Sequence, residues 1–181
     1  MSHYERRLPH WNVVGQPLFV TFRLHGSLPA HRVFPPKQLA GSGRQFVLMD
    51  RILDRGAIGP LHLRRPEIAE LVIDALRTGA GTLQRCQLHT FVVMPNHVHL
   101  LVTPNVGGTR WLGPLKGFIG RQANLALGNQ GRPFWQDESY DRLVRSSTEF
   151  ERVRRYIELN PVTAGLVATP EQFLWSSASR R

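Results

Sequence analysis

The middle of the chain contains two apolar runs of strand length that are separated by one tight turn. Residues 87–94 and 97–103 are rich in Val, Phe and Leu, and Pro95-Asn96 between them is typical of a turn. Runs joined this closely predict a β-hairpin, because only antiparallel strands can be connected by a short turn. The chain is therefore expected to contain an antiparallel sheet built around this hairpin.

The remaining hydrophobic pattern adds helices to that sheet. The predicted elements, in chain order, are a strand at 18–25, a helix opening at Pro66, the hairpin, a helix at 110–127, a short extended segment near 134–144, and a helix over 148–160 that opens with a capping box at Thr148–Glu151 and ends before Pro161. This order predicts an α+β fold with an antiparallel sheet and the helices on one face.

The length of 181 residues predicts a single domain spanning 1–181, with an irregular insertion at about 29–60 that is rich in Pro and Gly. Inside the insertion, 45–54 has the pattern of a helix whose inward residues are Phe46, Met49, Ile52 and Leu53. No apolar run reaches transmembrane length and no signal peptide is visible, so no membrane partner is expected. Cys86 is the only cysteine, which excludes an internal disulfide and makes a cytoplasmic location the default expectation.

The formal net charge is +10, and Arg supplies nearly all of the positive side chains because Lys occurs only at Lys37 and Lys116. The planar guanidinium group binds phosphate through two donors, so this excess favours a polyanionic partner such as a nucleic acid. Codon bias in a GC-rich genome is an alternative explanation for the ratio of Arg to Lys. That alternative does not remove the charge.

His97 and His99 lie on either side of Val98 in the second strand of the hairpin. Successive strand side chains point to opposite faces, so the two imidazoles share one face and Val98 points into the core on the other. Two neutral imidazoles close together suit a divalent metal ion. Because such a pair is also common as two ordinary surface residues, it does not define a site alone.

The last predicted helix carries a second pair of polar residues. Tyr156 and Asn160 are four residues apart and are therefore neighbours on one side of the helix. The adjacent apolar stripe consists of Phe150, Val153 and Ile157. Packing of this stripe on the sheet would hold Tyr156 and Asn160 where the two histidines can reach them. The alternative is that Tyr156 is half-buried at a rim and that Asn160 merely precedes a proline.

Two histidines, a further polar ligand and a tyrosine suit metal-assisted attack on a phosphodiester. A metal ion polarises a non-bridging oxygen, and a tyrosine that attacks phosphorus conserves the bond energy as a phosphotyrosine. Free tyrosine has a pKa of about 10. The phenol must therefore lose its proton to a neighbour or be stabilised as an anion by the metal or an arginine.

Several motifs occur together between about Leu18 and Ser177. They are Phe91–Asn96 followed by His97-Val98-His99, then Phe134-Trp135-Gln136, then Tyr156–Pro161 with Ala164–Val167, and finally Trp175–Ser177. This combination resembles the single-tyrosine HUH transposases and is most similar to their REP-associated, domesticated bacterial branch. The combination is specific, although each motif alone is not.

The resemblance implies a ferredoxin-like fold, a Mg²⁺ or Mn²⁺ cofactor, and cleavage of single-stranded DNA at the foot of a hairpin. The products would be a 5′-phosphotyrosine and a free 3′-OH, and the partners would be REP-like palindromic hairpins bound by a monomer rather than an interlocked dimer. By matching positions, it implies that His97, His99 and Asn160 are metal ligands and that Tyr156 is the nucleophile. Insertion-sequence relatives usually have Gln in place of Asn160, and the shorter side chain is expected to alter metal binding.

Candidates for contact with single-stranded DNA are basic and aromatic residues, because such sites combine a positive groove with stacking rings. They are Arg110, Trp111, Lys116 and Arg121 in one predicted helix, and Arg152 and Arg155 beside Tyr156. The alternative for the first group is a core tryptophan among solvated charges. The alternative for the second group is a solvated helix surface.

Tyr140 is the rival nucleophile, although it lies in an extended segment without an amide partner one helical turn away. Two other functions remain open: a hairpin-binding protein without catalysis, and a plasmid-replication initiator with the same nicking chemistry, which is typically larger. A two-histidine phosphoesterase needs two separated His-x-Ser/Thr motifs, which the chain lacks. A zinc hydrolase is disfavoured as well, because no third His or carboxylate lies at a convincing spacing in the sequence.

Overall fold

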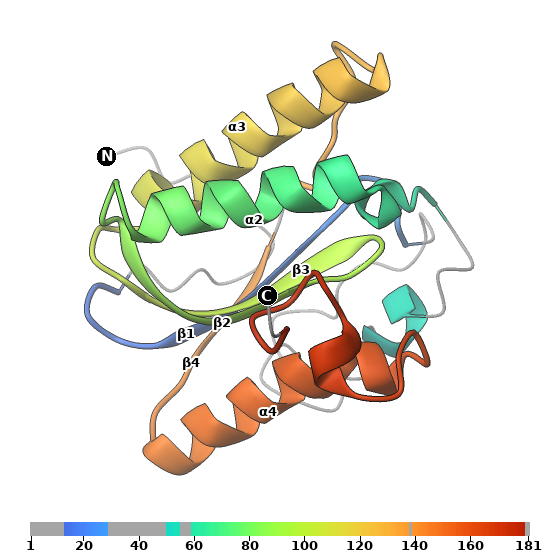
Figure 1. Ribbon diagram of the computed structural model, residues 1–181. Coiled ribbons are helices and arrows are strands. Elements are labelled where there is room, and N and C mark those ends of the chain that lie inside the picture. Colours follow the sequence, from blue (N-terminus) through green and yellow to red (C-terminus); the bar gives the residue numbers. More distant parts are fainter. Residues whose placement is uncertain (1–12, 29–49, 55–58, 138, 180–181) are drawn as a thin grey trace.

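Four antiparallel strands form one sheet in the order β2-β3-β1-β4 (Figure 1). The strands are β1 (Leu18–Arg23), β2 (Cys86–Val93), β3 (His97–Pro104) and β4 (Tyr140–Leu143). The computed structural model describes residues 13–28, 50–54, 59–137 and 139–179. Most of the predicted insertion, including Phe46 and Met49, lies outside the described residues. Residues 50–54 are helical, as the pattern predicted, and Leu53 is buried.

Strands β2 and β3 form the predicted hairpin, with Val93 opposite Val98 next to the turn. Strand β1 lies between β3 and β4, so the chain crosses the sheet once before and once after the hairpin. The crossings are made by α2 (Pro66–Ala80) and α3 (Gly108–Leu127). Two strand–helix–strand units interleaved in one antiparallel sheet make a ferredoxin-like arrangement. The predicted α+β class is confirmed.

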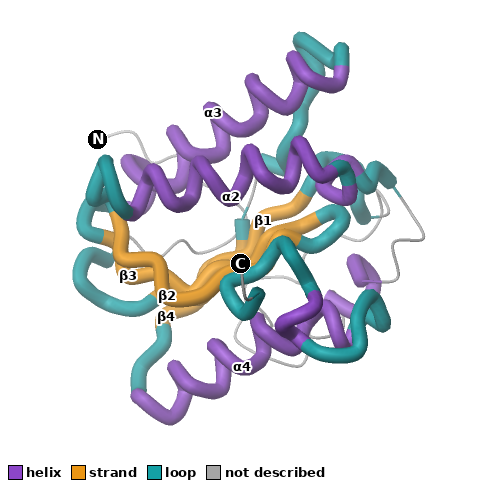
Figure 2. The backbone as a smooth tube through the Cα atoms, in the orientation of Figure 1, coloured by secondary structure: helices purple, strands orange, loops and turns teal. Residues whose placement is uncertain are grey.

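One face of the sheet packs against α2 and α3, which lie next to each other (Figure 2). Alternate residues of β1 and β3 point to this side, and they meet the apolar stripes of both helices. The central residues of this first core are Val20, Phe22, Val98, Leu100, Ile68, Val72 and Ile119. Val98 has no exposed surface, so its predicted inward orientation is confirmed.

The opposite face of the sheet packs against α4 (Ser147–Thr163), as Figure 2 shows. The prediction that the helices lie on one face is therefore wrong for this helix. The physical reason is that β1 is buried along its whole length and β3 along nearly all of its length, because both faces carry apolar side chains. The second core contains Phe19, Val92, Met94, Leu101 and Ile157, with Phe150 and Val153 at its border. The predicted apolar stripe of the helix is confirmed.

Both ends of α4 differ from the prediction. The N-cap is Ser146, whose hydroxyl accepts a hydrogen bond from Glu149 N at 3.1 Å, so the helix opens before Thr148. Its C-terminal end passes through Pro161 to Thr163. A proline in the last turn removes a single backbone donor, and the turn is still closed by a 2.9 Å bond from Ala164 N to Asn160 O.

The C-terminal segment returns to the sheet and pairs along the outer edge of β2. The backbone N–H of Val93 donates to Trp175 O at 2.8 Å, and Ser177 N donates to Phe91 O at 3.0 Å. Two short 3-10 helices, His62–Arg64 and Pro170–Gln172, complete the regular structure of the described residues. In the part of the chain that the structure describes, no helix combines the length and apolar character needed to cross a membrane.

Replacing Phe22 by Ala should reduce the free energy of unfolding by about 3–5 kcal/mol, because a large ring is removed from a closed core. Phe22 is 1% exposed, and its ring meets Trp135 edge to face at 4.8 Å. Denaturant unfolding followed by circular dichroism measures the change. Phe118→Ala is the matched control, since Phe118 is 43% exposed on α3. Equal losses in the two variants would contradict this description of the core.

Candidate metal site and adjoining tyrosine

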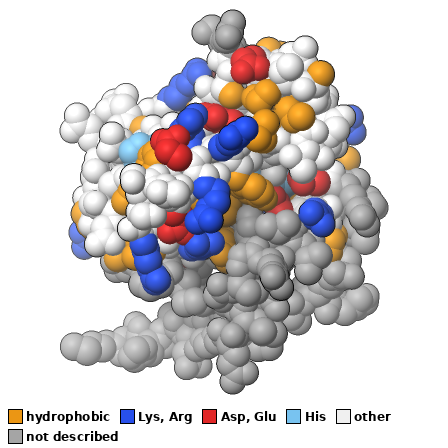
Figure 3. All heavy atoms as spheres, turned by 90° about the horizontal axis from the view of Figure 1, so that it is seen from below, with side chains coloured by type: hydrophobic (Ala, Val, Ile, Leu, Met, Phe, Trp, Pro, Cys, Tyr) orange, Lys and Arg blue, Asp and Glu red, His pale blue; other side chains and the backbone are white. Residues whose placement is uncertain are grey.

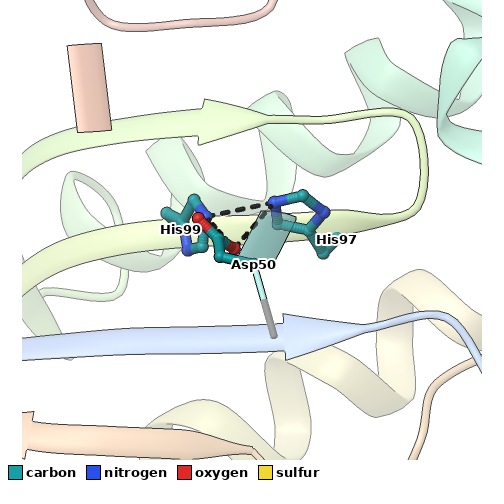
Figure 4. Close-up of side chains that lie close together, drawn as sticks. All are labelled: Asp50, His97 and His99. Atoms are coloured by element: carbon teal, nitrogen blue, oxygen red, sulfur yellow. Dashed lines mark hydrogen bonds and ion pairs between the residues drawn. The ribbon is translucent and has the colours of Figure 1, made fainter. Parts of the chain in front are cut away.

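His97 and His99 lie side by side on the α4 face of the sheet, as their alternation in the strand predicted. Both have no exposed surface, and their Nε2 atoms are 3.0 Å apart (Figure 4). Two buried ring nitrogens at this separation need either a shared proton or a cation between them, because two lone pairs repel each other. The strand therefore presents a pair of nitrogen donors to one point.

Hydrogen bonds to the other ring nitrogens set the direction of these donors. Asn96 Nδ2 donates to Leu53 O at 2.9 Å, which turns Asn96 Oδ1 toward His97 Nδ1 at 2.7 Å. A carbonyl oxygen can only accept, so His97 carries its proton on Nδ1 and its Nε2 lone pair faces the site. His99 Nδ1 lies 2.7 Å from Thr21 Oγ1, which can accept in the same way. Histidine ligands of metal ions are commonly held by such supporting bonds.

Asp50 adds a carboxylate to the two imidazoles. It lies in the helical residues 50–54, and its Oδ1 atom is 3.0 Å from His99 Nε2 and 3.5 Å from His97 Nε2 (Figure 4). Two ligands of a small divalent ion lie about 3.0 Å apart in octahedral geometry and about 3.4 Å apart in tetrahedral geometry. Among the described residues, Asp50 Oδ1 is buried without a hydrogen-bond partner. The donor set and its spacing therefore fit a divalent metal ion.

The second oxygen of the same carboxylate binds the two polar residues of α4. The hydroxyl of Tyr156 donates to Asp50 Oδ2, and Asn160 Nδ2 donates to the same atom at 3.1 Å. The Tyr156 ring is also 5.8 Å from the His99 ring and 6.0 Å from the Phe19 ring, in edge contacts. The structure thus brings together all four residues that the sequence singled out, His97, His99, Tyr156 and Asn160, around one aspartate.

Burial and charge shift the pKa values of these groups in different directions. Burial, followed by the electrostatic effect of the neighbouring His99, lowers the pKa of His97 to about 3, so its imidazole is neutral at pH 7 and available as a ligand. Burial alone would raise the pKa of Asp50, but the neighbouring His99 and His97 imidazoles lower it well below its usual range. Burial and the neighbouring Asp50 raise the pKa of Asp54 to about 7.

The pKa of the Tyr156 phenol is shifted upward. Burial, the charge of Asp50 and the hydrogen bond to Asp50 raise its pKa far above the usual value. The phenol therefore stays protonated at neutral pH while the carboxylate of Asp50 faces it. Positive charge added at the imidazole–carboxylate cluster would act in the opposite sense and favour the phenolate.

The structure separates the predicted DNA-contact residues into two groups. Arg110, Trp111, Lys116 and Arg121 belong to α3, on the side of the sheet opposite the two histidines. Trp111 is 4% exposed in the first core, so the alternative of a core tryptophan is correct and its ring cannot stack on a base. Lys116 Nζ donates to the backbone carbonyl groups of Gln136 and Asp137, at 2.8 Å and 3.2 Å.

Arg152 and Arg155 are exposed on α4, which covers the histidine face. Their neighbour Arg154 is paired with Glu151 and Glu158, at 2.9 Å and 2.8 Å. Among the described residues, no ion pair within 4.0 Å involves Arg152 or Arg155. These two arginines are therefore the predicted DNA-contact residues that lie on the same side of the sheet as the site.

Tyr140, the rival nucleophile, lies in β4 opposite Thr21. Its ring meets Phe19 at 6.2 Å, and burial raises the pKa of its phenol. The charged groups that act on it are Arg142, Asp141 and Glu149 rather than the imidazoles. The structure thus places Tyr156, and not Tyr140, on the carboxylate that faces the histidines.

Asp50 is the site residue that sequence reasoning missed. It lies within the predicted helix 45–54, whose apolar pattern identifies only the hydrophobic residues of that segment. The signal was present in the spacing of Asp50, Leu53 and Asp54, which places two carboxylates on the same side of the helix as a buried leucine. The distance in sequence between Asp50 and His97 hid their proximity in space.

Comparisons with known proteins identify a structural relative. No protein family matches the chain by sequence, and no curated protein matches it. A solved structure of a REP-associated tyrosine transposase bound to a REP hairpin superposes with a TM-score of 0.54 and 20% sequence identity, over 98% of this chain and 82% of that one. At 20% sequence identity, this superposition shows that the two chains share a fold. The shared fold agrees with the ferredoxin-like arrangement that the motif resemblance implied.

Thr21→Val should weaken the binding of Mn²⁺ by about 10- to 100-fold, because it removes the partner that holds His99 Nδ1. Valine keeps the branched shape and the strand preference of threonine, so the fold should persist. Isothermal titration of the purified protein with MnCl₂ measures the dissociation constant. Thr103→Val is the matched control, since Thr103 Oγ1 lies 2.8 Å from His89 Nε2 and this pair is not part of the site. An unchanged constant in Thr21→Val would contradict the assigned role of this bond.

Proposed function

We propose that this protein is a metal-dependent DNA transposase of the HUH type, which cleaves and rejoins single-stranded DNA at hairpins through a 5′-phosphotyrosine intermediate. The observation that carries the proposal is the convergence of a tyrosine hydroxyl and two imidazoles on one buried carboxylate. The fold is also that of a tyrosine transposase that binds a REP hairpin. A tyrosine beside a metal site in this fold suits phosphoryl transfer to the tyrosine.

Tyr156 is the proposed nucleophile. Its Oη attacks the phosphorus as the hydroxyl proton passes to Asp50 Oδ2, which already accepts a hydrogen bond from it. The bond from phosphorus to the 3′ oxygen breaks, and that oxygen takes up a proton, so the leaving strand ends in a free 3′-OH. His97 and His99 are the proposed nitrogen ligands of Mg²⁺ or Mn²⁺, with an oxygen ligand from Asp50 or Asn160. A bound divalent ion supplies positive charge that polarises a non-bridging phosphate oxygen and offsets the carboxylate beside the phenol.

REP-like palindromic hairpins are the proposed DNA partners, and a monomer is the proposed functional form. The net charge of +10 favours a polyanion, and the exposed Arg152 and Arg155 lie on the same side of the sheet as Tyr156. Figure 3, which views the molecule from below, shows several Lys and Arg side chains on this face with acidic side chains among them. Phosphates bound along α4 would approach Tyr156 from this side.

A hairpin-binding protein without catalysis is the second candidate. It is favoured by the raised pKa of Tyr156, because a phenol that remains protonated and bonded to Asp50 does not attack phosphate. The two candidates share their DNA partner and differ in the formation of a covalent bond.

Tyr156→Phe should abolish covalent attachment to DNA and preserve hairpin binding, because only the hydroxyl is removed. Labelled single-stranded hairpins, drawn from repeats near the gene, are incubated with the protein and Mn²⁺ or Mg²⁺ and resolved on a denaturing gel. Tyr140→Phe is the matched control and should form the adduct at the wild-type level. Loss of the adduct in Tyr140→Phe alone would assign the nucleophile to Tyr140. Tight binding without any adduct in the wild type would favour the second candidate.

Arg152→Ala and Arg155→Ala should each weaken hairpin binding and reduce the slope of log K against log salt concentration. Each phosphate contact that is lost reduces the slope by about 0.7 to 0.9, because fewer counterions are released. Fluorescence anisotropy at several salt concentrations measures the slope. Arg121→Ala, on the opposite side of the sheet, should leave it unchanged. A reduced slope in Arg121→Ala alone would place the DNA on α3 instead.

A further inference from the structure

Three buried oxygen atoms near the two histidines lack a hydrogen-bond partner among the described residues. They are Asp50 Oδ1, Asp54 Oδ1 and Asn160 Oδ1. Each is a possible third ligand, and the motif resemblance points to Asn160. Their positions relative to the two Nε2 atoms distinguish them.

Asp50 Oδ1 is the oxygen that approaches both imidazoles, at 3.0 Å from His99 Nε2 and 3.5 Å from His97 Nε2. Asp54 Oδ1 lies farther away, at 3.9 Å from His97 Nε2. Among the described His, Cys, Asp and Glu residues, the set whose ligand atoms all lie within 4.8 Å of one another is Asp50, His97 and His99. Asp50 therefore completes a three-donor cluster that Asp54 does not join.

Asn160 contacts the cluster through its amide nitrogen. Its Nδ2 donates to Asp50 Oδ2 at 3.1 Å, so this nitrogen is already used as a donor to the carboxylate. An amide NH₂ group also has no lone pair available to a metal ion. The contact instead holds the carboxylate by Oδ2, together with the hydroxyl of Tyr156, while Oδ1 faces the histidines.

Charge gives a second, independent argument. His97, His99 and Asp50 are between 0% and 3% exposed, so an ion held there would be shielded from water. A buried cation requires a compensating anion, and two neutral imidazoles with a neutral amide provide none. The carboxylate of Asp50 supplies this negative charge at the point where the nitrogen donors meet.

We propose that Asp50 is the third metal ligand of this site, through Oδ1, and that Asn160 is a positioning residue that orients the Asp50 carboxylate. The ligand set is then two imidazoles and one carboxylate, which suits Mn²⁺ and binds Mg²⁺ more weakly because nitrogen ligands disfavour it. Oδ2 of the same carboxylate holds the hydroxyl of Tyr156, so the ligand also positions the nucleophile. This inference rests on the proposed function only in taking the cluster to be a metal site.

The test is a titration of the full chain with MnCl₂ alone, in which isothermal calorimetry measures the dissociation constant. Asp50→Asn should weaken binding by more than 100-fold, beyond the effect of losing a supporting partner. Asp54→Asn should stay within about threefold of the wild type, since Asp54 Oδ1 lies 3.9 Å from His97 Nε2 and makes no hydrogen bond to either imidazole. Asp74→Asn, an exposed carboxylate on α2, is the control and should be unchanged.

A second measurement separates a lost ligand from a lost fold. Mn²⁺ should raise the Tm of the wild type and of Asp74→Asn but not that of Asp50→Asn. Cooperative unfolding of Asp50→Asn in the absence of metal would show that this variant is folded. If Asp50→Asn does not fold, Asp50→Glu is used, and it should retain Mn²⁺ binding because the carboxylate is kept. In Asn160→Ala, the electron paramagnetic resonance spectrum of bound Mn²⁺ should change, which a purely structural role would not cause.

Four results would overturn the inference: no Mn²⁺ binding by the wild type, wild-type affinity in Asp50→Asn, loss of binding in Asp50→Glu, or a larger loss in Asp54→Asn or Asn160→Ala than in Asp50→Asn. The adduct assay distinguishes this failure from failure of the proposed function. If Asp50→Asn loses Mn²⁺ binding while the wild type forms no adduct with any hairpin, the ligand assignment stands and the transposase proposal fails. If Asp50→Asn forms the adduct with wild-type dependence on metal, the ligand assignment fails and the transposase proposal stands.

Discussion

The complete burial of two histidines on a central strand is the constraint on which the site depends. Polar groups removed from water must find partners within the protein, or they cost several times what a hydrogen bond contributes. His97 and His99 meet this requirement on one side through Asn96 and Thr21, which leaves both Nε2 atoms directed at a single point. Asp50, from a different part of the chain, places its carboxylate oxygen at that point. The cluster is thus a consequence of covering both faces of the sheet.

Helix α4 joins the folding of the protein to its proposed chemistry. Ile157 is completely buried against the sheet, and this contact fixes the rotation of the helix. Tyr156 and Asn160 flank that anchor, so the packing that buries an isoleucine also delivers a hydroxyl and an amide to Asp50. Small rotations of α4 would move both groups together. The geometry of the nucleophile is therefore determined largely by apolar packing.

The sequence was sufficient for features that depend on local periodicity. The hairpin, the shared face of His97 and His99, and the apolar stripe of α4 all follow from spacing within a few residues. It was insufficient where distant segments meet. Burial of the second sheet face required knowing that Phe19 and Leu101 need cover from a helix, and the role of Asp50 required knowing where 50–54 lies. Trp111 shows the same limit, because an aromatic ring among arginines is identical in sequence whether it stacks on a base or fills a core.

The return of the C-terminal segment to β2 has a consequence for association between molecules. An open sheet has two edges, and unpaired backbone groups along an edge can recruit a strand from another chain. Here residues near Trp175 and Ser177 use donors and acceptors of β2, while the opposite edge is β4, which is only four residues long. Within the described residues, the returning segment thus covers the edge of β2 over residues 91–93, and the edge at β4 is short. Residues 175–177 therefore block the addition of a strand from another molecule at this end of β2.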